Sequence, residues 1–226
     1  MSDGGTVLRR VGVIGDVHGE DAALEAALAY LATLGPLDAI LCTGDVAAKK
    51  GEGDTDRCCR LLADAGALCV RGNHDRWTLE SGGDPALAAI GLGDRLASRA
   101  SLAFLKALPE TRTFATPLGK LLLCHGVGGD DMAGVYPGDD EAAAQRILAE
   151  KRLDRGDYRV HLAGHTHRRM ARTVCGVTLL NPGTLRWDEQ PGFAVADFTE
   201  GAWTLYDLAP FTNEITQSET IRLFTR

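Results

Sequence analysis

The sequence predicts an α/β domain in which two mixed sheets stack on each other and helices lie on the outside. Three observations lead to this prediction. The first third of the chain alternates strand, helix, strand, helix and strand, whereas the last third consists of successive hairpins. Hydrophobic residues make up 45% of the 226 residues, which is enough to bury a sizeable core. We expect one domain over residues 1–226, with a small helical cap within residues 77–110.

The first third of the chain predicts a parallel sheet. Apolar runs that end at glycine or at a polar turn indicate buried strands, and Leu24, Leu28 and Leu31 recur at helical spacing. Consecutive parallel strands need crossover helices, and the predicted helices supply them. The predicted elements are strands 11–14, 39–43 and 68–70 and helices 21–34 and 55–65. The polar, glycine-bearing residues 1–6 are expected to fray.

The rest of the chain predicts hairpins around one strongly helical stretch, residues 140–153. Residues 77–108 are helical in pattern but less regular, which is why we expect a cap there. Alternating apolar residues around turn glycines predict the hairpins 111–116/120–124, 170–175/177–180 and 193–198/203–208, with a short strand at 160–163. Residues 215–226 could add an edge strand or stay loose.

Composition excludes some classes of function. The net charge of -7, from 24 basic and 31 acidic residues, argues against a protein that coats nucleic acid. A small phosphorylated substrate is compatible with it, because a bound metal ion can supply local positive charge. No apolar run approaches the ~20 residues that span a bilayer, and no signal-peptide pattern is present. We therefore expect a cytoplasmic protein with no membrane partner, and leave a homo-oligomer open. The six cysteines are expected to be reduced and to pack as small, buried hydrophobic residues.

Five of the six histidines fall in short segments rich in Gly, Asp and Asn, each of which follows a predicted strand. Ligands gather past the carboxyl ends of strands in α/β sheets. Residues two apart on an extended chain point to the same side, so Asp16 and His18 can share one site. Imidazole, carboxylate and amide donors together suit Mn, Fe, Zn or Ni. There are too many donors for one ion but enough for two, if a carboxylate bridges them. The segments are Asp16-Val-His18, Gly44-Asp45, Gly72-Asn-His-Asp75, His125-Gly126 and Gly164-His-Thr-His167.

This ordered set of motifs resembles the calcineurin-like metallophosphoesterase superfamily, and within it the compact bacterial and archaeal phosphodiesterase-like branch. The resemblance implies a four-layer α/β/β/α sandwich with two divalent ions, manganese first, and Fe, Zn or Ni as alternatives. His74 matches the catalytic histidine of the family. The resemblance implies that Asp16, His18, Asp45 and His167 hold one ion, and that Asp45, Asn73, His125 and His165 hold the other.

Departures from the family pattern leave the partner of His74 open. The phosphoprotein phosphatase branch has a second aspartate, which partners the catalytic histidine, where this chain has Ala48. Asp75 is a candidate substitute. His161 lies inside an apolar strand, and we interpret it as structural.

The leading functional prediction is a phosphoesterase that cleaves a phosphodiester or small phosphorylated metabolite with a bridging hydroxide. Arg76 and Arg186 lie near the motifs and could bind the substrate phosphate, although solvated surface arginines are an equal alternative. The alternatives are a phosphomonoesterase or phosphoprotein phosphatase, and a non-catalytic metal-binding scaffold such as the retromer subunit that shares this fold. A nuclease is disfavoured by the net charge.

Overall fold

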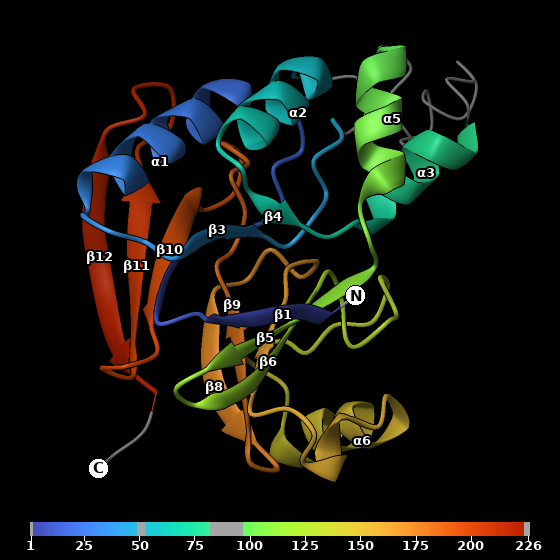
Figure 1. The fold of residues 1–226 in the computed structure, drawn as a ribbon, viewed down its shortest axis with the longest axis vertical. Helices are drawn as coiled ribbons and strands as arrows, with labels where there is room; N and C mark the ends of the chain where they lie inside the picture. Colours follow the sequence, from blue (N-terminus) through green and yellow to red (C-terminus); the bar gives the residue numbers. More distant parts are fainter. Residues whose placement is uncertain (1, 49–52, 82–96, 224–226) are drawn as a thin grey trace.

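The computed structural model describes residues 2–48, 53–81 and 97–223, which contain two stacked sheets of six strands each (Figure 1). The first sheet has the order β12-β11-β10-β2-β3-β4. Its strands are β2 (Arg10–Ile14), β3 (Ala39–Cys42), β4 (Leu68–Cys69), β10 (Gly192–Asp197), β11 (Ala202–Leu208) and β12 (Ile215–Arg222). The strands β2, β3 and β4 are parallel, as predicted, and β10 joins β2 in antiparallel orientation.

The second sheet has the order β1-β5-β6-β7-β9-β8. Its strands are β1 (Ser2–Val7), β5 (Thr111–Thr116), β6 (Gly119–Cys124), β7 (Val160–Leu162), β8 (Met170–Val174) and β9 (Val177–Asn181). The pairs β5/β6 and β8/β9 are the predicted antiparallel hairpins, whereas β6, β7 and β9 run parallel. This sheet is therefore also mixed.

Helices cover the outer faces of both sheets (Figure 1). The helices are α1 (Asp21–Thr33), α2 (Thr55–Asp64), α3 (Asn73–Ser81), α5 (Arg99–Ala107) and α6 (Glu141–Glu150), followed by the 3-10 turn η1 (Leu153–Arg155). In Figure 1, α1 and α2 lie over the first sheet, α5 lies beside α2, α3 lies beside α5, and α6 lies at the opposite end against the second sheet. The predicted four-layer α/β/β/α sandwich is confirmed.

Strict alternation along the strands builds three apolar clusters. In β2, Val13 faces the core between the sheets, whereas the next residue, Ile14, packs with Leu24 of α1. In β6, Leu123 enters the inter-sheet core and its neighbour Leu122 faces the layer of α6. Because strands such as β2 and β6 are apolar on both faces, both sheets must be covered on both sides, which requires four layers.

Two expectations differ from the structure. Residues 1–6 were expected to fray, but Ser2–Val7 forms β1, which pairs in parallel with the edge of β5. A strand that adds to an open edge is stabilised by backbone hydrogen bonds and needs little pattern of its own. Of the two alternatives left open for residues 215–226, the structure shows the edge strand, β12. Helix α3 begins at Asn73, earlier than predicted. The expected cap within 77–110 falls partly on residues 82–96, outside the described residues, and stays a prediction.

The cysteines follow the expectation with one exception. Cys42, Cys58, Cys59, Cys69 and Cys124 are free and buried. Cys175 is exposed, because it lies in the β8–β9 turn, where its φ is +51°.

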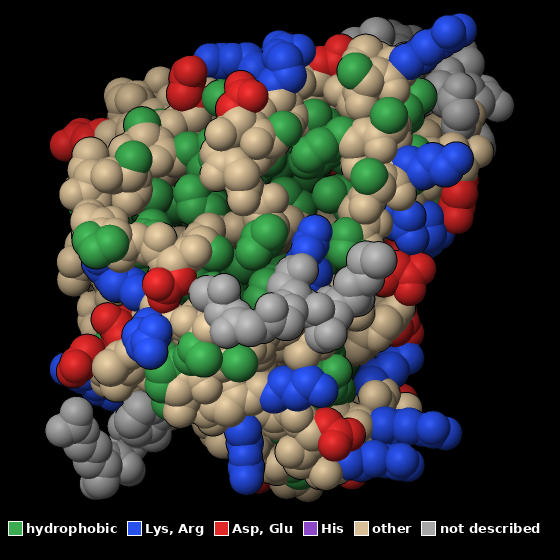
Figure 2. Space-filling model, viewed as in Figure 1, with side chains coloured by type: hydrophobic (Ala, Val, Ile, Leu, Met, Phe, Trp, Pro, Cys, Tyr) green, Lys and Arg blue, Asp and Glu red, His purple; other side chains and the backbone are tan. Residues whose placement is uncertain are grey.

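The described residues have a surface typical of neither a membrane-spanning helix nor a single block of charge. None of their helices has the length and apolar content to cross a membrane. On the face drawn in Figure 2, Lys and Arg side chains lie over α2, beside α3 and α5 and around α6, and acidic side chains stand among them.

Candidate metal centre

Each predicted ligand segment follows the carboxyl end of a parallel strand. In the first sheet, the chain passes from β2, β3 and β4 into the segments of Asp16, Asp45 and Asn73. In the second sheet, β6 leads directly into His125 and β7 into the segment of His165. Since the two sheets stack, these strand ends meet at one edge of the sandwich, where ligands bind in such folds. All seven predicted ligand residues come together there.

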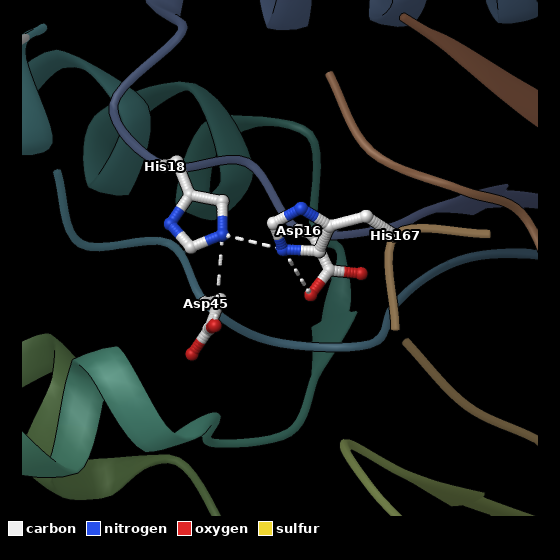
Figure 3. A group of neighbouring side chains, drawn as sticks. All are labelled: Asp16, His18, Asp45 and His167. Atoms are coloured by element: carbon white, nitrogen blue, oxygen red, sulfur yellow. Dashed lines mark hydrogen bonds and ion pairs between the residues drawn. The ribbon is translucent and has the colours of Figure 1, made fainter. Parts of the chain in front are cut away.

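The first group of donors consists of Asp16, His18, Asp45 and His167 (Figure 3). One ligand atom from each residue lies within 4.8 Å of the others. The Nε2 atoms of His18 and His167 are 3.0 Å apart. Asp16 Oδ1 lies 3.6 Å from His167 Nε2, and Asp45 Oδ2 lies 3.7 Å from His18 Nε2. Two imidazole nitrogens that converge beside two carboxylates form a set of donors that can hold one divalent ion.

The second group lies on the other side of Asp45. His125 Nε2 is 3.3 Å from Asp45 Oδ2 and 2.9 Å from Asn73 Oδ1. His165 Nδ1 is 3.0 Å from the same amide oxygen. His125 Nδ1 lies 2.8 Å from the carbonyl oxygen of Thr43, to which it can donate, and this leaves Nε2 for the cluster.

Backbone strain is concentrated in the cluster. Asp16, His18, Asp45, His165 and His167 have φ values of 34°, 50°, 51°, 65° and 57°. Residues with a Cβ rarely adopt this left-handed region, and such strain persists where the surroundings impose it, often at functional sites. The neighbouring glycines give the carboxylates room, because a Cβ on Gly72 would lie 2.1 Å from Asp45 Oδ1, and one on Gly164 would lie 2.5 Å from Asp16 Oδ2.

Hydrogen bonds from the backbone hold the carboxylates in place. The amide of His165 donates to Asp16 Oδ1 at 2.9 Å, and the amide of His74 donates to Asp45 Oδ1 at 2.8 Å. The segment Asn181-Pro-Gly-Thr184 supports the same loops. Asn181 Nδ2 donates to the Gly164 carbonyl at 2.7 Å, and Thr184 Oγ1 donates to the Asp16 carbonyl at 2.8 Å. The second sheet thus fixes the loop that bears Asp16.

Burial and mutual charge shift the acids and bases of the cluster. Burial raises the pKa of Asp16 to about 6 and lowers that of His18 well below its usual range. Burial would lower the pKa of His125, but Asp45 and Asp16 outweigh it and raise that pKa to about 10. Burial would likewise raise the pKa of Asp45, but His125, His18 and His74 lower it below its usual range.

The residues fit a bound cation. Asp16 Oδ2 is buried and has no hydrogen-bond partner within the described part of the chain. A buried carboxylate oxygen without a partner is costly unless a positive charge compensates it. The buried Asp/His cluster therefore has the donors and the uncompensated negative charge that suit a divalent cation.

His74 and Asp75 start helix α3, but their contacts differ. The His74 ring packs edge-on against His18 and against Trp77, with centroid separations of 4.8 Å in both cases. Asp75 accepts hydrogen bonds from the amides of Ala47 at 2.8 Å and Gly72 at 2.9 Å. It therefore ties the loop after β3 to the loop after β4. Its role as the partner of His74 stays a prediction.

The two predicted phosphate-binding arginines lie on different sides of the cluster. Arg76 forms a two-point contact with Asp131, at 2.7 and 3.2 Å. It lines a cavity of about 110 Å³ that also reaches His125 and Gly126. Arg186 is largely buried, and its Nη2 lies 2.5 Å from Asp188. Substrate binding by either residue stays a prediction.

Glu189 is a residue that the sequence did not single out. Its Oε1 accepts a hydrogen bond of 2.7 Å from Nδ1 of His167, which leaves Nε2 of that ring for the cluster. Arg186 Nε lies 3.4 Å from the same oxygen. A carboxylate behind a ligating histidine orients the ring and raises its basicity. Only the unusual acidity of the loop after Thr184 could have drawn attention to it.

Known proteins share this fold. The structure of a metallophosphoesterase from Sphaerobacter thermophilus is 19% identical, with a TM-score of 0.59 over 85% of this chain and 84% of that chain. A hypothetical protein from Pyrococcus horikoshii OT3 is 15% identical, with a TM-score of 0.69 over 97% and 88%. An archaeal phosphodiesterase is 15% identical, with a TM-score of 0.52 over 92% and 98%. At these identities the likeness shows the fold.

Sequence comparison gives the family. No curated protein sequence matches the chain. The calcineurin-like phosphoesterase superfamily domain matches residues 10–201, a span that contains every residue of the cluster. The chain belongs to the calcineurin-like phosphoesterase superfamily.

Proposed function

We propose that this protein is a metal-dependent phosphoesterase that hydrolyses a phosphodiester or a small phosphorylated metabolite at a dinuclear centre. The position of Asp45 is the observation that carries the proposal. Its Oδ2 lies 3.7 Å from His18 Nε2 and 3.3 Å from His125 Nε2, so that one carboxylate faces both groups of donors. A carboxylate shared by two ions is a common feature of two-metal phosphatases and nucleases.

The two donor groups give the two ligand sets of the proposal. Asp16, His18, Asp45 and His167 would hold one ion, and Asp45, Asn73, His125 and His165 would hold the second. The mixture of imidazole, carboxylate and amide donors suits manganese, which we favour, and also iron, zinc or nickel.

The proposed mechanism assigns a role to each side chain around the ions. When bound, two such ions lower the pKa of a shared water and stabilise charge on the phosphoryl oxygens. Asp45 keeps the two donor groups in register, and Asp75 fixes the loop that bears Asp45 through the Ala47 amide. His74 donates a ring N–H proton to the leaving oxygen. Arg76 and Arg186 would bind phosphoryl oxygens from the two sides of the cluster.

A phosphodiester is favoured over a phosphomonoester by the resemblance to the phosphodiesterase-like branch. The archaeal phosphodiesterase with the same fold supports this preference. A non-catalytic scaffold is the second candidate, since a retromer subunit, Vps29 from Entamoeba histolytica, also has this fold. The complete donor set with His74 beside it favours the enzyme.

The proposal extends to the setting of the protein. We infer a cytoplasmic enzyme with a small substrate and no membrane partner, and its assembly as a homo-oligomer through the edge strand β12 is a further option. Light scattering on a size-exclusion column tests the assembly, and a single-chain mass across a hundredfold concentration range would contradict it.

The decisive experiment compares two substrates on metal-exchanged protein. The chain is stripped of metal and then given Mn, Fe, Zn, Ni or Mg in turn. Hydrolysis of bis-p-nitrophenyl phosphate and p-nitrophenyl phosphate is then measured, and Asp45→Asn is the matched variant. We expect diester hydrolysis that returns with manganese and falls at least a hundredfold in Asp45→Asn, because the amide cannot bridge two ions as a carboxylate does.

The outcomes separate the candidates. A preference for the monoester would replace the diester assignment by a phosphomonoesterase. Two ions bound per chain without turnover of either substrate would favour the scaffold. Equal activity of Asp45→Asn and the wild type would exclude the dinuclear mechanism.

A further inference from the structure

An exposed aromatic pair lies beside the metal cluster. The Trp187 side chain is 52% exposed and Phe211 is 84% exposed, the largest fraction among the large apolar residues that the structure describes. Their ring centroids are 5.5 Å apart at an interplanar angle of 41°. Trp187 lies in the loop between β9 and β10, and Phe211 lies in the connection between β11 and β12. Two separate loops thus bring these rings together in water.

The loop that bears Trp187 is joined to the cluster on two sides. Trp187 follows Arg186, whose Nε lies 3.4 Å from Glu189 Oε1, and that oxygen accepts the hydrogen bond from His167. Glu20, two residues beyond His18, lies near the Trp187 backbone and near Arg186. The indole therefore stands at the rim of the His18 and His167 half of the cluster.

The backbone of Phe211 has an unfavourable conformation. Its φ is +67°, a left-handed conformation that bulky residues rarely adopt. Backbone hydrogen bonds close the turn, from Ala209 N to Glu214 O at 2.8 Å and from Asn213 N to Ala209 O at 3.0 Å. The turn thus combines backbone strain with the exposure of a large apolar ring. Features of this kind persist where a ligand uses them.

We propose that Trp187 and Phe211 form a stacking platform for a planar, uncharged group on the alcohol part of the substrate's phosphate ester, such as a nucleobase. The inference rests on the proposed phosphoesterase function and names a substrate class for it: phosphate esters with an aromatic group. Aromatic side chains bind bases of any sequence through their faces.

The charges around the platform determine which part of the substrate it binds. Asp188 and Glu189 directly follow Trp187 in the chain and pair with Arg186, so this loop presents no excess of positive charge that would hold a phosphate over the rings. The phosphate is therefore directed into the cluster, and the neutral planar group is left to the platform. A protein partner is disfavoured, because two rings cover far less than the roughly 1,000 Å² that a stable interface needs.

The test compares ligands that differ only in the planar group. Binding of thymidine 5′-monophosphate and of methyl phosphate to the manganese-loaded protein is measured by calorimetry. We expect the wild type to bind the nucleotide at least tenfold more tightly. Trp187→Ala and Phe211→Ala should each remove most of this preference, and Trp187→Phe should keep most of it. Val7→Ala, which replaces an exposed apolar residue on β1, is the control and should leave the preference unchanged.

Other outcomes would overturn the inference. Equal affinities in the wild type, or an unchanged preference in both alanine variants, would remove the platform. A lower oligomeric mass in the variants with an unchanged preference would instead assign the rings to a contact between copies. Hydrolysis of methyl p-nitrophenyl phosphate, measured in parallel, reports on the proposed function separately. Binding preference without hydrolysis would refute the enzyme and leave the platform in place.

Discussion

The position of the His74 side chain determines what this residue can do in the reaction. Its ring lies against His18 and Trp77, so it stands at the edge of the first donor group. A residue in that place can reach a leaving oxygen without coordinating either ion. Chemistry and metal binding should therefore be separable by mutation.

His74→Ala is expected to reduce kcat for a poor leaving group such as an alkoxide by about 100- to 10,000-fold, because it removes a general acid. With p-nitrophenolate, which needs little protonation, the loss should be much smaller. Metal content by elemental analysis should stay near that of the wild type. Undiminished turnover with the alkoxide leaving group would remove His74 from the mechanism.

Glu189 gives a second prediction for a single residue. Glu189→Gln should weaken the affinity for the ion at the His18 and His167 group by about 10- to 100-fold, because the amide no longer fixes and polarises the His167 ring. Manganese titration followed by calorimetry measures it. Asp188→Asn, which alters the neighbouring ion pair with Arg186, is the matched control. Equal affinity in Glu189→Gln and the wild type would show that the contact is incidental.

The difference between these residues also shows what the sequence can predict. His125 and Asp45 are predictable because each follows a buried strand and stands beside a glycine. Glu189 stands in no such pattern, since its role depends on how the loop after β9 folds back on the segment after β7. Residues that act through a long-range contact leave no periodic signal.

At the scale of elements, the structure differs from the prediction at helix and chain ends. Helix α3 includes Asn73 and His74, so these residues lie in its first turn instead of in a preceding loop. Helix starts are hard to place where predicted metal ligands such as Asn73, and not capping residues, occupy the first turn. The strand β1 depends on an open edge at β5, which the first residues alone do not reveal.

Helix α6 provides a prediction about an element. Its N-cap, Asp140, accepts a hydrogen bond from the amide of Ala143 at 2.7 Å. Asp140→Ala should lower the free energy of unfolding by about 1 kcal/mol, since a first-turn amide loses its partner. Urea denaturation measures this change. Activity should be unaffected, because the helix covers the outer face of the second sheet. A change below about 0.3 kcal/mol would mean that water replaces the cap.

At the scale of the whole molecule, the fold was predictable because both sheets combine local signals with apolar alternation. The strands and hairpins follow from periodicity, and the stacking follows because each sheet buries both faces. What the sequence did not reveal was the strand order of the second sheet, in which β7 lies between β6 and β9. That order is set by packing between distant segments.

The buried His161 makes the stability of the whole molecule depend on pH. Its Nε2 accepts from the Gly128 amide at 3.4 Å and lies 3.1 Å from Cys124 Sγ, and burial lowers its pKa to about 4. The unfolded chain takes up a proton below about pH 6.5 and the folded chain does not until about pH 4. Stability is therefore full above pH 6.5 and is lost as the pH falls towards 4.

The test uses metal-free protein and urea denaturation at pH 7 and pH 5. His161→Asn should lose about 2 kcal/mol less than the wild type between these pH values, because its side chain does not titrate. The variant can be less stable at both values without affecting this difference. Parallel pH profiles for the two proteins would contradict the assignment.

The distribution of the donor residues over both sheets has a consequence for assembly of the fold. Asp16, Asp45 and Asn73 extend from one sheet, and His125 and His165 from the other. A cation bound between them would contact residues of both sheets, so it could bind only when the two sheets are packed together. Each ion, at a free concentration a hundredfold above its Kd, would then add about 2.7 kcal/mol to the free energy of unfolding. The concentration of free metal would thereby determine the stability of the folded protein as well as its activity.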